Sequence, residues 1–290
     1  MENKKTIGHL TAIFTIFIWG ITFISTKVLL NKFAPIEILF FRFAIALAAL
    51  IIIYPHRLKI KDKKQEILFM GAGICGVTLY YLLENIALTY TMASNVAVIL
   101  SAAPFFTAIF THIFRKKEKL YINFFIGFIL AMAGICLISF NGSRLHLNPL
   151  GDLLALGAAV VWAAYSVITK KISDYGYNTI QATRRIFIYG LLFMIPVLSV
   201  SGFRFDLARF TDKVCLFNIL FLGLGASALC FVTWNFTLKV LGAVKTSVYI
   251  YMTPVVTIIA SFIFLGEKLT YISLAGTVLT LTGLILSERK

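Results

Sequence analysis

Charged residues are scarce in this sequence. They make up 13% of its 290 residues, while hydrophobic residues make up 60%. Soluble globular proteins carry about 25% charged and about 45–50% apolar residues. The scarcity of charge therefore argues against an ordinary soluble domain. Apolar runs of about 20 residues, the length that crosses a bilayer as a helix, fill the chain. The sequence predicts an all-α polytopic membrane protein.

Motifs for enzymatic and nucleotide chemistry are also missing. The four cysteines lie inside apolar runs without C-x-x-C spacing, which favours free thiols over disulfides or a metal site. No G-x-x-x-x-G-K-S/T loop is present, so any transport must be driven by a gradient rather than by ATP bound to this chain. The spans hold no cluster of His, Asp or Glu with metal or acid–base spacing. We expect no cofactor, no metal and no enzymatic activity.

The basic residues lie where they would set the orientation of a membrane protein. Ten spans fit the apolar runs, and of the 27 Lys and Arg residues 17 fall on the side of the two termini and 6 on the other side. Cytoplasmic loops are enriched in Lys and Arg, so we expect a cell-membrane protein with both termini in the cytoplasm. This placement accounts for the net charge of +15 without a nucleic-acid partner. The predicted spans are 6–29, 35–54, 67–88, 93–114, 120–140, 150–170, 180–201, 215–238, 244–265 and 269–287.

One unusual segment occurs twice. Residues 16–27 read "IFIWGITFISTK" and residues 159–170 read "AVVWAAYSVITK", so that a Trp, a Thr and a Lys match at an offset of 143 residues. Further matches, at offsets of 143, 150 and 149 residues, are Arg42 with Arg185, Asn85 with Asn235, Pro104 with Pro254, Gly127 with Gly276 and Gly134 with Gly283. The chain is therefore an internal duplication.

Each half of the duplication contains five of the predicted spans. The first half covers residues 6–140 and the second covers residues 150–287. Because five is an odd number, the second half enters the membrane from the opposite side and is inverted. Inverted repeats that enclose a binding site near the middle of the bilayer are a transporter architecture. On this interpretation the segment recurs because each half supplies an equivalent part of one pathway.

Four stretches resemble those of a known family: "WGITFISTK", "APIEILFFRF", "ASNVAVILSAAPFFTAIF" and the closing "TPVVTIIASFIFLGEKLTYISLAGTVLTLTGLIL". On these stretches the chain is identified as a member of the EamA-type carriers of the drug/metabolite transporter superfamily. The resemblance implies ten helices in two repeats. It also implies a central cavity surrounded by the third, fourth, eighth and ninth helices and parts of the first and sixth.

Two departures limit what the resemblance carries over. The sequence reads "FRKKEKL" where the family usually has LGE, and its first span lacks the glutamate that small multidrug members use. Their proton-coupling mechanism is therefore not transferred by position. Family members move amino acids, sugars, nucleotide-type metabolites and drugs, so the resemblance leaves the substrate open.

Glu84, in "LYYLLENIALTY", is the sharpest single candidate for function. An ionised side chain in the middle of a membrane costs about 2.5–3.5 kcal/mol on insertion scales, so such residues usually face a pathway or a partner. Glu84 either binds a substrate amine or a proton during the cycle, or forms a static bridge with Arg42 or Lys27. Its match in the second half is Trp234. Since the fold does not need the charge twice, a functional role is favoured.

The remaining candidates are basic, amide, aromatic and proline residues. Arg42 and Arg185 brace helix ends or contact an anionic substrate, with bracing favoured, and Lys27 is expected to reach the headgroups and to assist that bracing. The buried amides bind either a neighbouring helix or the substrate, the aromatic side chains are candidates for the cavity wall, and the prolines weaken their helices as hinges of a gate. The amides are Asn85 and Asn235, the aromatic residues are Trp19, Tyr80, Trp162, Tyr165, Trp234 and Tyr251, and the prolines are Pro104 and Pro254.

Taken together, these features predict a secondary carrier of small metabolites that works by alternating access. Export of amino acids or similar small amphipathic solutes is the leading interpretation, because one carboxylate beside aromatic rings suits a cationic or zwitterionic ligand. Import of a metabolite and broad drug efflux are the alternatives, and a non-transporting membrane sensor is a remote one. The expected partners are a small-molecule substrate, the lipid bilayer and a proton as candidate coupling ion. The choice between monomer and homodimer stays open.

Overall fold

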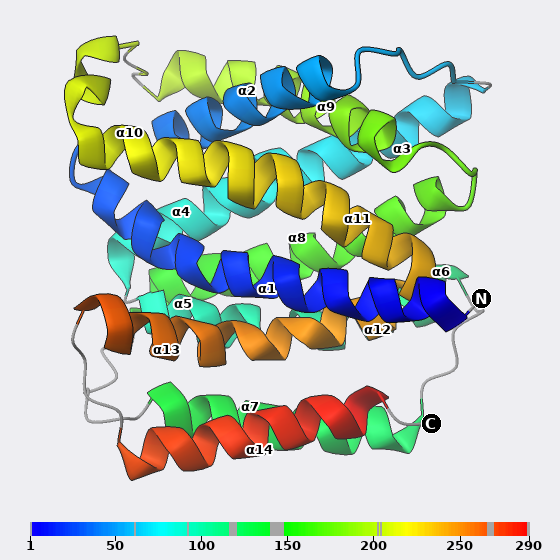
Figure 1. Cartoon of the computed structure of the whole chain (residues 1–290), viewed down its shortest axis with the longest axis vertical. Coiled ribbons are helices and arrows are strands. Elements are labelled where there is room, and N and C mark those ends of the chain that lie inside the picture. The colour runs from blue at the N-terminus through cyan, green and yellow to red at the C-terminus, as the bar shows by residue number, and fades with distance from the viewer. Residues whose placement is uncertain are drawn as a thin grey trace.

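The computed structural model describes residues 2–60, 62–91, 93–115, 121–139, 148–201, 203, 205–265 and 270–288, and this part of the chain contains helices and no β-strand. Both termini lie at the same end of the helices (Figure 1), which we call the terminal end; the opposite end is the far end. The prediction of an all-α protein is confirmed. Basic residues of the predicted charge asymmetry that lie outside the described residues are Lys61, Lys116, Lys117, Lys119, Arg144, Arg204, Lys268, Arg289 and Lys290.

The helices follow the predicted spans along the chain. The first half contains α1 (Glu2–Leu30), α2 (Pro35–Ile53), α3 (Lys63–Gly73), η1 (Ile74–Leu79), α4 (Tyr80–Tyr90), α5 (Ala93–Leu100), α6 (Ala103–Arg115) and α7 (Ile122–Ser139). The second half contains α8 (Pro149–Ser173), α9 (Thr179–Val200), η2 (Leu207–Thr211), α10 (Lys213–Leu220), η3 (Phe221–Leu229), α11 (Cys230–Leu241), α12 (Ala243–Val248), η4 (Tyr249–Tyr251), α13 (Met252–Leu265) and α14 (Tyr271–Glu288).

Many of these helices have the length and composition of membrane spans. Within the described residues, seven helical stretches are long and apolar enough to cross a bilayer, and two shorter apolar stretches are Ile122–Leu137 and Leu274–Ser287. The multi-pass architecture is thus supported, whereas the count of ten spans stays a prediction.

Short polar residues fix where the helices of the second half begin. The side-chain oxygens of Asn148, Asn178 and Asp212 accept hydrogen bonds from the backbone N–H groups of Gly151 at 3.1 Å, Ile180 at 2.9 Å and Val214 at 2.8 Å. These N–H groups have no partner within the helix, so an oxygen at the cap satisfies them. The loops can therefore be short without leaving backbone donors unpaired.

Asp212 also joins the two halves at the far end through a salt bridge with Lys32. Its hydrogen bond with Lys32 lowers the pKa of Asp212 below 3.8, and the same bond raises the pKa of Lys32 above 10.5. The lowered carboxyl pKa means that the pair stabilises the fold fully above pH 3.8 and loses this contribution as the pH falls through the folded-state pKa. At alkaline pH the salt bridge keeps its contribution to stability until the pH rises through the folded-state pKa of Lys32, which is raised above 10.5.

We expect Asp212→Asn, which keeps an oxygen to cap α10, to lower the melting temperature of the purified protein modestly because the pair is exposed to solvent. The difference from the wild type should be constant from about pH 5 to about pH 9 and shrink as Asp212 becomes protonated. Thermal melting across this range measures it. A difference in melting temperature that grows toward acid pH would contradict the stabilising salt bridge between Asp212 and Lys32.

The helices are interrupted at matching places in the two halves. The π-helical segments η1 and η3 end at Leu79 and Leu229, which are 150 residues apart. Pro104 follows the break between α5 and α6, and Pro254 follows the 3₁₀ turn η4. A proline removes a backbone donor and clashes with the preceding turn, so the interruptions before Pro104 and Pro254 are those the sequence predicts, while their role as hinges stays a prediction. The π segments were not predicted.

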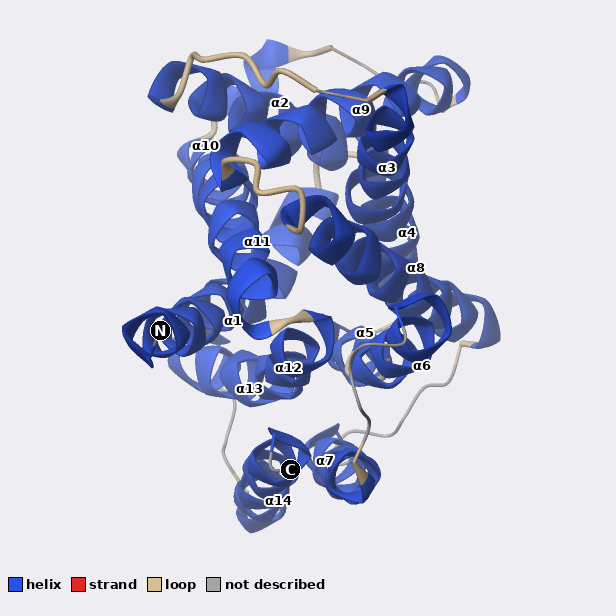
Figure 2. Cartoon of the chain, turned by 90° about the vertical axis from the view of Figure 1, so that its right-hand side faces the viewer, coloured by secondary structure: helices blue, strands red, loops and turns tan. Residues whose placement is uncertain are grey.

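The contacts between the two halves come in matching pairs, in which each helix is replaced by its counterpart from the other half. Helix α1 packs on α11 while α8 packs on α4, and α2 packs on η3 while α9 packs on η1. Helices α7 and α14 pack closely on one another and lie to one side of the other helices in both views (Figures 1 and 2). This arrangement places the middle of α1, α4 and α8 around a common centre.

Candidate functional site

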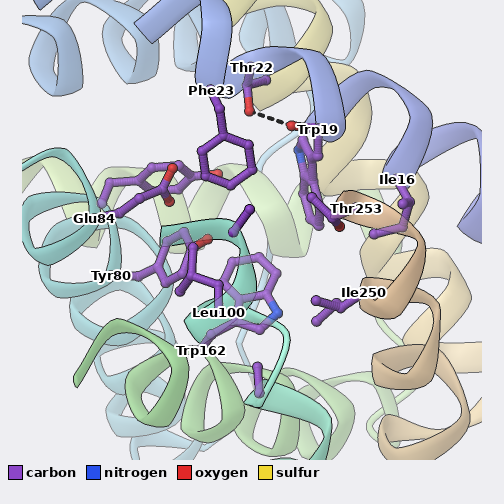
Figure 3. A pocket seen from close by; sticks show the side chains of 13 residues that line it. Ile16, Trp19, Thr22, Phe23, Tyr80, Glu84, Leu100, Trp162, Ile250 and Thr253 are labelled. Carbon is purple, nitrogen blue, oxygen red and sulfur yellow. Dashed lines mark hydrogen bonds between the residues drawn. The ribbon is translucent and has the colours of Figure 1, made fainter. Parts of the chain in front are cut away.

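A small cavity lies at this centre, and helices of both halves form its wall (Figure 3). The lining side chains come from α1, α4, α5, α6, α8, η4 and α13. They are Ile16, Trp19, Thr22, Phe23, Tyr80, Tyr81, Glu84, Ala97, Leu100, Ala103, Trp162, Ile250 and Thr253. Four of the candidates from the sequence, Trp19, Tyr80, Glu84 and Trp162, are therefore brought together.

The two tryptophans of the repeated segment form one aromatic wall. Their ring centroids lie 5.3 Å apart in an edge-to-face arrangement, and Tyr80 lies 4.7 Å from Trp162. The indole N–H of Trp19 donates to the Ala226 carbonyl oxygen at 2.9 Å, whereas that of Trp162 is buried without a partner. Figure 3 shows this nitrogen on the side of Ile250. The wall thus offers aromatic faces and one free hydrogen-bond donor.

Glu84 brings a carboxylate to this aromatic cavity. Its side chain is buried, its Oε2 atom has no hydrogen-bond partner, and the Tyr80 hydroxyl lies within reach one turn earlier on α4. Within the described part of the chain, no Lys or Arg nitrogen lies within 4.0 Å of its oxygens. The alternative of a static bridge between Glu84 and Arg42 or Lys27 is therefore not what the structure contains. The carboxylate is available to a ligand.

Lys27 and Lys170 hold the ends of helices. Lys27 Nζ donates to the Leu88 carbonyl oxygen at 3.0 Å near the C-terminus of α4, and Lys170 Nζ donates to the Lys239 carbonyl oxygen at 3.2 Å near the C-terminus of α11. A cation there binds carbonyl groups that lack a partner within the helix and offsets the helix dipole. Each lysine thus binds the backbone of another helix in its own half, as the bracing expected of Lys27 requires, while the contact of Lys27 with headgroups stays a prediction.

The arginines that match in the repeat have different surroundings. Arg42 is 1% exposed, its Nε atom donates to Ser227 Oγ at 2.9 Å, and its guanidinium lies 4.2 Å from the centroid of the Tyr81 ring. Arg185 is only partly buried and forms an ion pair of 2.5 Å with Glu66. Of the two, only Arg185 therefore has a carboxylate partner among the described residues, and the expectation that both arginines brace helix ends stays a prediction.

The remaining candidates do not line the cavity. Asn235 accepts from the Tyr165 hydroxyl at 2.7 Å and donates to Thr183 Oγ1 at 2.9 Å, while Asn85 donates to the Pro35 carbonyl oxygen at 3.2 Å. Both amides therefore join helices. Trp234 packs against Trp19 with ring centroids 5.0 Å apart, and Tyr251 is buried in a cluster with α7 and α14.

Replacing Asn235 should destabilise the protein more than replacing Asn85. Asn235→Leu leaves the buried Tyr165 hydroxyl without its acceptor, a loss of about 1–3 kcal/mol in the free energy of unfolding. Asn85→Leu is the control, because the Oδ1 atom of Asn85 is already buried without a partner. Denaturation of both variants in detergent compares the two losses. Equal losses would mean that the Tyr165–Asn235–Thr183 chain does not carry the stability assigned to it.

Most of the cavity residues that the sequence did not identify are aliphatic or small. On α1, Ile16, Thr22 and Phe23 stand three or four residues from Trp19, the spacing that places side chains on one helix face, so helical periodicity from Trp19 would have found them. Ala97, Ala103 and Ile250 carry no chemical signal of their own. Among the described residues no three His, Cys, Asp or Glu side chains group as a metal site.

The family model and the named relatives agree that the chain is similar to transporters. The model of the EamA-like transporter family matches residues 6–140 and 149–289. A relative called an uncharacterized transporter, from Archaeoglobus fulgidus, is 29% identical over 99% of this chain and 99% of its own length. A relative from Streptantibioticus cattleyicolor, called a probable terminal-alkyne amino-acid exporter, is 24% identical over 100% of this chain and 95% of its own length.

A crystal structure supports the same fold. It superimposes with a TM-score of 0.77 over 99% of this chain and 97% of the other chain, at 18% sequence identity. At this identity the likeness concerns the fold alone.

Proposed function

The chain belongs to the EamA-like transporter family, and on this premise we propose that it is a secondary carrier that moves small metabolites across the cytoplasmic membrane by alternating access. In this proposal its helices form ten spans in two inverted repeats, residues 6–140 and 150–287. The matching helix interruptions and the exchanged contacts between the halves support the inversion. Pro104 and Pro254 then serve as hinges at equivalent places of the two gates.

The observation that carries the proposal is a buried carboxylate with a free oxygen in an aromatic cavity. Glu84 Oε2 lacks a partner, and the faces of Trp19, Tyr80 and Trp162 line the same space. Such a site binds an ammonium group by a charge-assisted hydrogen bond and by attraction to aromatic faces. Amino acids and similar small amphipathic amines fit this chemistry, with export as the direction and a proton as candidate coupling ion. The relative called a probable terminal-alkyne amino-acid exporter supports this choice.

The excess of basic residues at the terminal end supports the orientation. Lys and Arg are enriched in cytoplasmic loops, and 17 of 27 fall on the side of the termini in the ten-span arrangement. We therefore place both termini in the cytoplasm, with the loop between α1 and α2 outside the cell.

Metabolite profiling tests the direction and the substrate class together. Medium and cytosol of cells that express the protein are compared with those of cells that carry an empty vector. We expect amino acids or small amines to accumulate in the medium of the expressing cells. Accumulation in the cytosol instead would make the protein an importer, and a rise of unrelated lipophilic drugs alone would favour broad efflux. No change in any compound would contradict the proposal.

A further inference from the structure

Arg42 is a buried cation that makes no salt bridge within the described residues. Its side chain is 1% exposed on α2, its Nε atom is occupied by Ser227, and its Nη2 atom is buried with no hydrogen-bond partner. Within the described residues no carboxylate lies within 4.0 Å of the guanidinium. A buried cation with an unused donor is costly in a membrane interior, and such residues usually face a pathway or a partner.

The other arginines packed among the helices are supplied with oxygen acceptors. Arg185, the match of Arg42 in the repeat, binds Glu66. Its neighbour Arg184 donates to the carbonyl oxygens of Tyr54 and His56. Arg209 forms an ion pair of 2.8 Å with Glu37. Arg42 therefore differs from these three arginines because, among the described residues, its guanidinium has neither a carboxylate nor a carbonyl acceptor.

A single aromatic ring separates Arg42 from the cavity. The guanidinium lies 4.2 Å from the centroid of the Tyr81 ring, and Tyr81 itself lines the cavity. Tyr81 and Glu84 are three residues apart on α4, which places them on the same face of the helix. Arg42, on α2, and Glu84, on α4, are both about ten ångströms from the far end at 1.5 Å per residue. A positive group packed on the Tyr81 ring and a negative group on the same helix face as Tyr81 thus each have a free atom.

We propose that Arg42 binds the carboxylate of a zwitterionic substrate while Glu84 binds its ammonium group, and that the Tyr81 ring moves aside as the substrate enters. This inference rests on the proposed function and narrows its substrate class to molecules that carry both charges. A guanidinium binds a carboxylate through two parallel hydrogen bonds, an interaction stronger than its contact with an aromatic face. The substrate then neutralises both protein charges, and a simple amine neutralises only Glu84.

Binding of matched ligands tests the assignment. Leucine and phenylalanine are compared with 3-methylbutylamine and 2-phenylethylamine, the amines that lack only the carboxylate. Because Trp19 and Trp162 line the cavity, intrinsic fluorescence of the purified protein reports ligand entry. We expect the wild type to bind at least one amino acid roughly tenfold or more tightly than its amine. Arg42→Gln should lose this preference while its affinity for the amine stays the same.

Two further variants separate binding from a structural role. Arg185→Gln is the matched control and should keep the preference for the amino acid, since its partner Glu66 lies outside the cavity lining. Arg42→Lys retains the positive charge and should recover part of the preference, provided that its melting temperature matches that of Arg42→Gln. Equal weakening of amino acid and amine by Arg42→Gln would make Arg42 a brace and overturn the inference.

Ligand binding by the wild type tests the role of Arg42 separately from the carrier proposal. Binding of the amines without any preference for the amino acids would leave the carrier proposal standing and would refute the role of Arg42. Failure of the wild type to bind any of the four ligands would refute the role of Arg42 and the amino-acid form of the proposed function together.

Discussion

Glu84→Gln is expected to remove most of the transport activity while leaving the protein folded. The substitution keeps the size of the side chain but removes the negative charge that we assign to the substrate ammonium. A hydrogen bond to a charged group contributes about 1.5–3 kcal/mol, which corresponds to roughly a 10- to 150-fold loss of affinity. Because Oε2 has no partner among the described residues, removing the charge breaks no salt bridge there. Transport by reconstituted vesicles at saturating and limiting substrate measures the loss.

Two comparisons keep the result for Glu84 interpretable. Glu84→Asp keeps the charge on a shorter side chain and should retain part of the activity. Trp234→Phe changes the residue at the matching place in the second half, which does not line the cavity, and should transport nearly as well as the wild type. Normal transport by Glu84→Gln across the full pH range would show that the carboxylate is not part of the site.

Gly134→Ala is expected to destabilise the protein by about 1–3 kcal/mol, the usual cost of overpacking a close contact. A β-carbon at this position would lie 2.5 Å from the Gly276 carbonyl oxygen and 2.5 Å from the Thr280 amide nitrogen. Both atoms belong to the backbone of α14, so the clash is relieved only by moving the whole helix away from α7. The melting temperature and the urea midpoint of the purified variant measure the effect.

Gly71→Ala is the matched control for this substitution. Gly71 is also helical, but a β-carbon there would meet the Ile168 side chain at 3.5 Å, an ordinary contact. Alanine stabilises a helix interior by about 0.5–1 kcal/mol relative to glycine, so this variant should be as stable as the wild type or slightly more stable. A similar loss in both variants would mean that the α7–α14 approach is not as close as the structure has it.

Some features of the cavity could be predicted because charge and repetition are visible in a sequence. Glu84 stood out because a charge within an apolar run is costly. Trp19 and Trp162 stood out because they recur at one offset, and the structure brings their rings together at 5.3 Å. The helix breaks before Pro104 and Pro254 followed from the missing backbone donor of proline.

Other features depend on contacts between residues far apart in the chain. Arg42 and Arg185 have the same place in the repeat, and only the presence of Glu66, 119 residues before Arg185, makes one paired and the other unpaired. The π-helical segments have no residue signature comparable to proline. For Lys27 and Lys170 the sequence does not show which helix ends lie beside them.

The most direct test of the carrier proposal is counterflow with the purified protein in liposomes without ATP. Liposomes are loaded with unlabelled amino acid, and the entry of a trace of the same labelled amino acid is followed. We predict transient accumulation of label in vesicles with the wild type and little with Glu84→Gln, because a carrier exchanges substrate through one alternating site. Absence of accumulation for every amino acid and amine tested, with protein shown to be folded and inserted, would contradict the carrier assignment of the cavity.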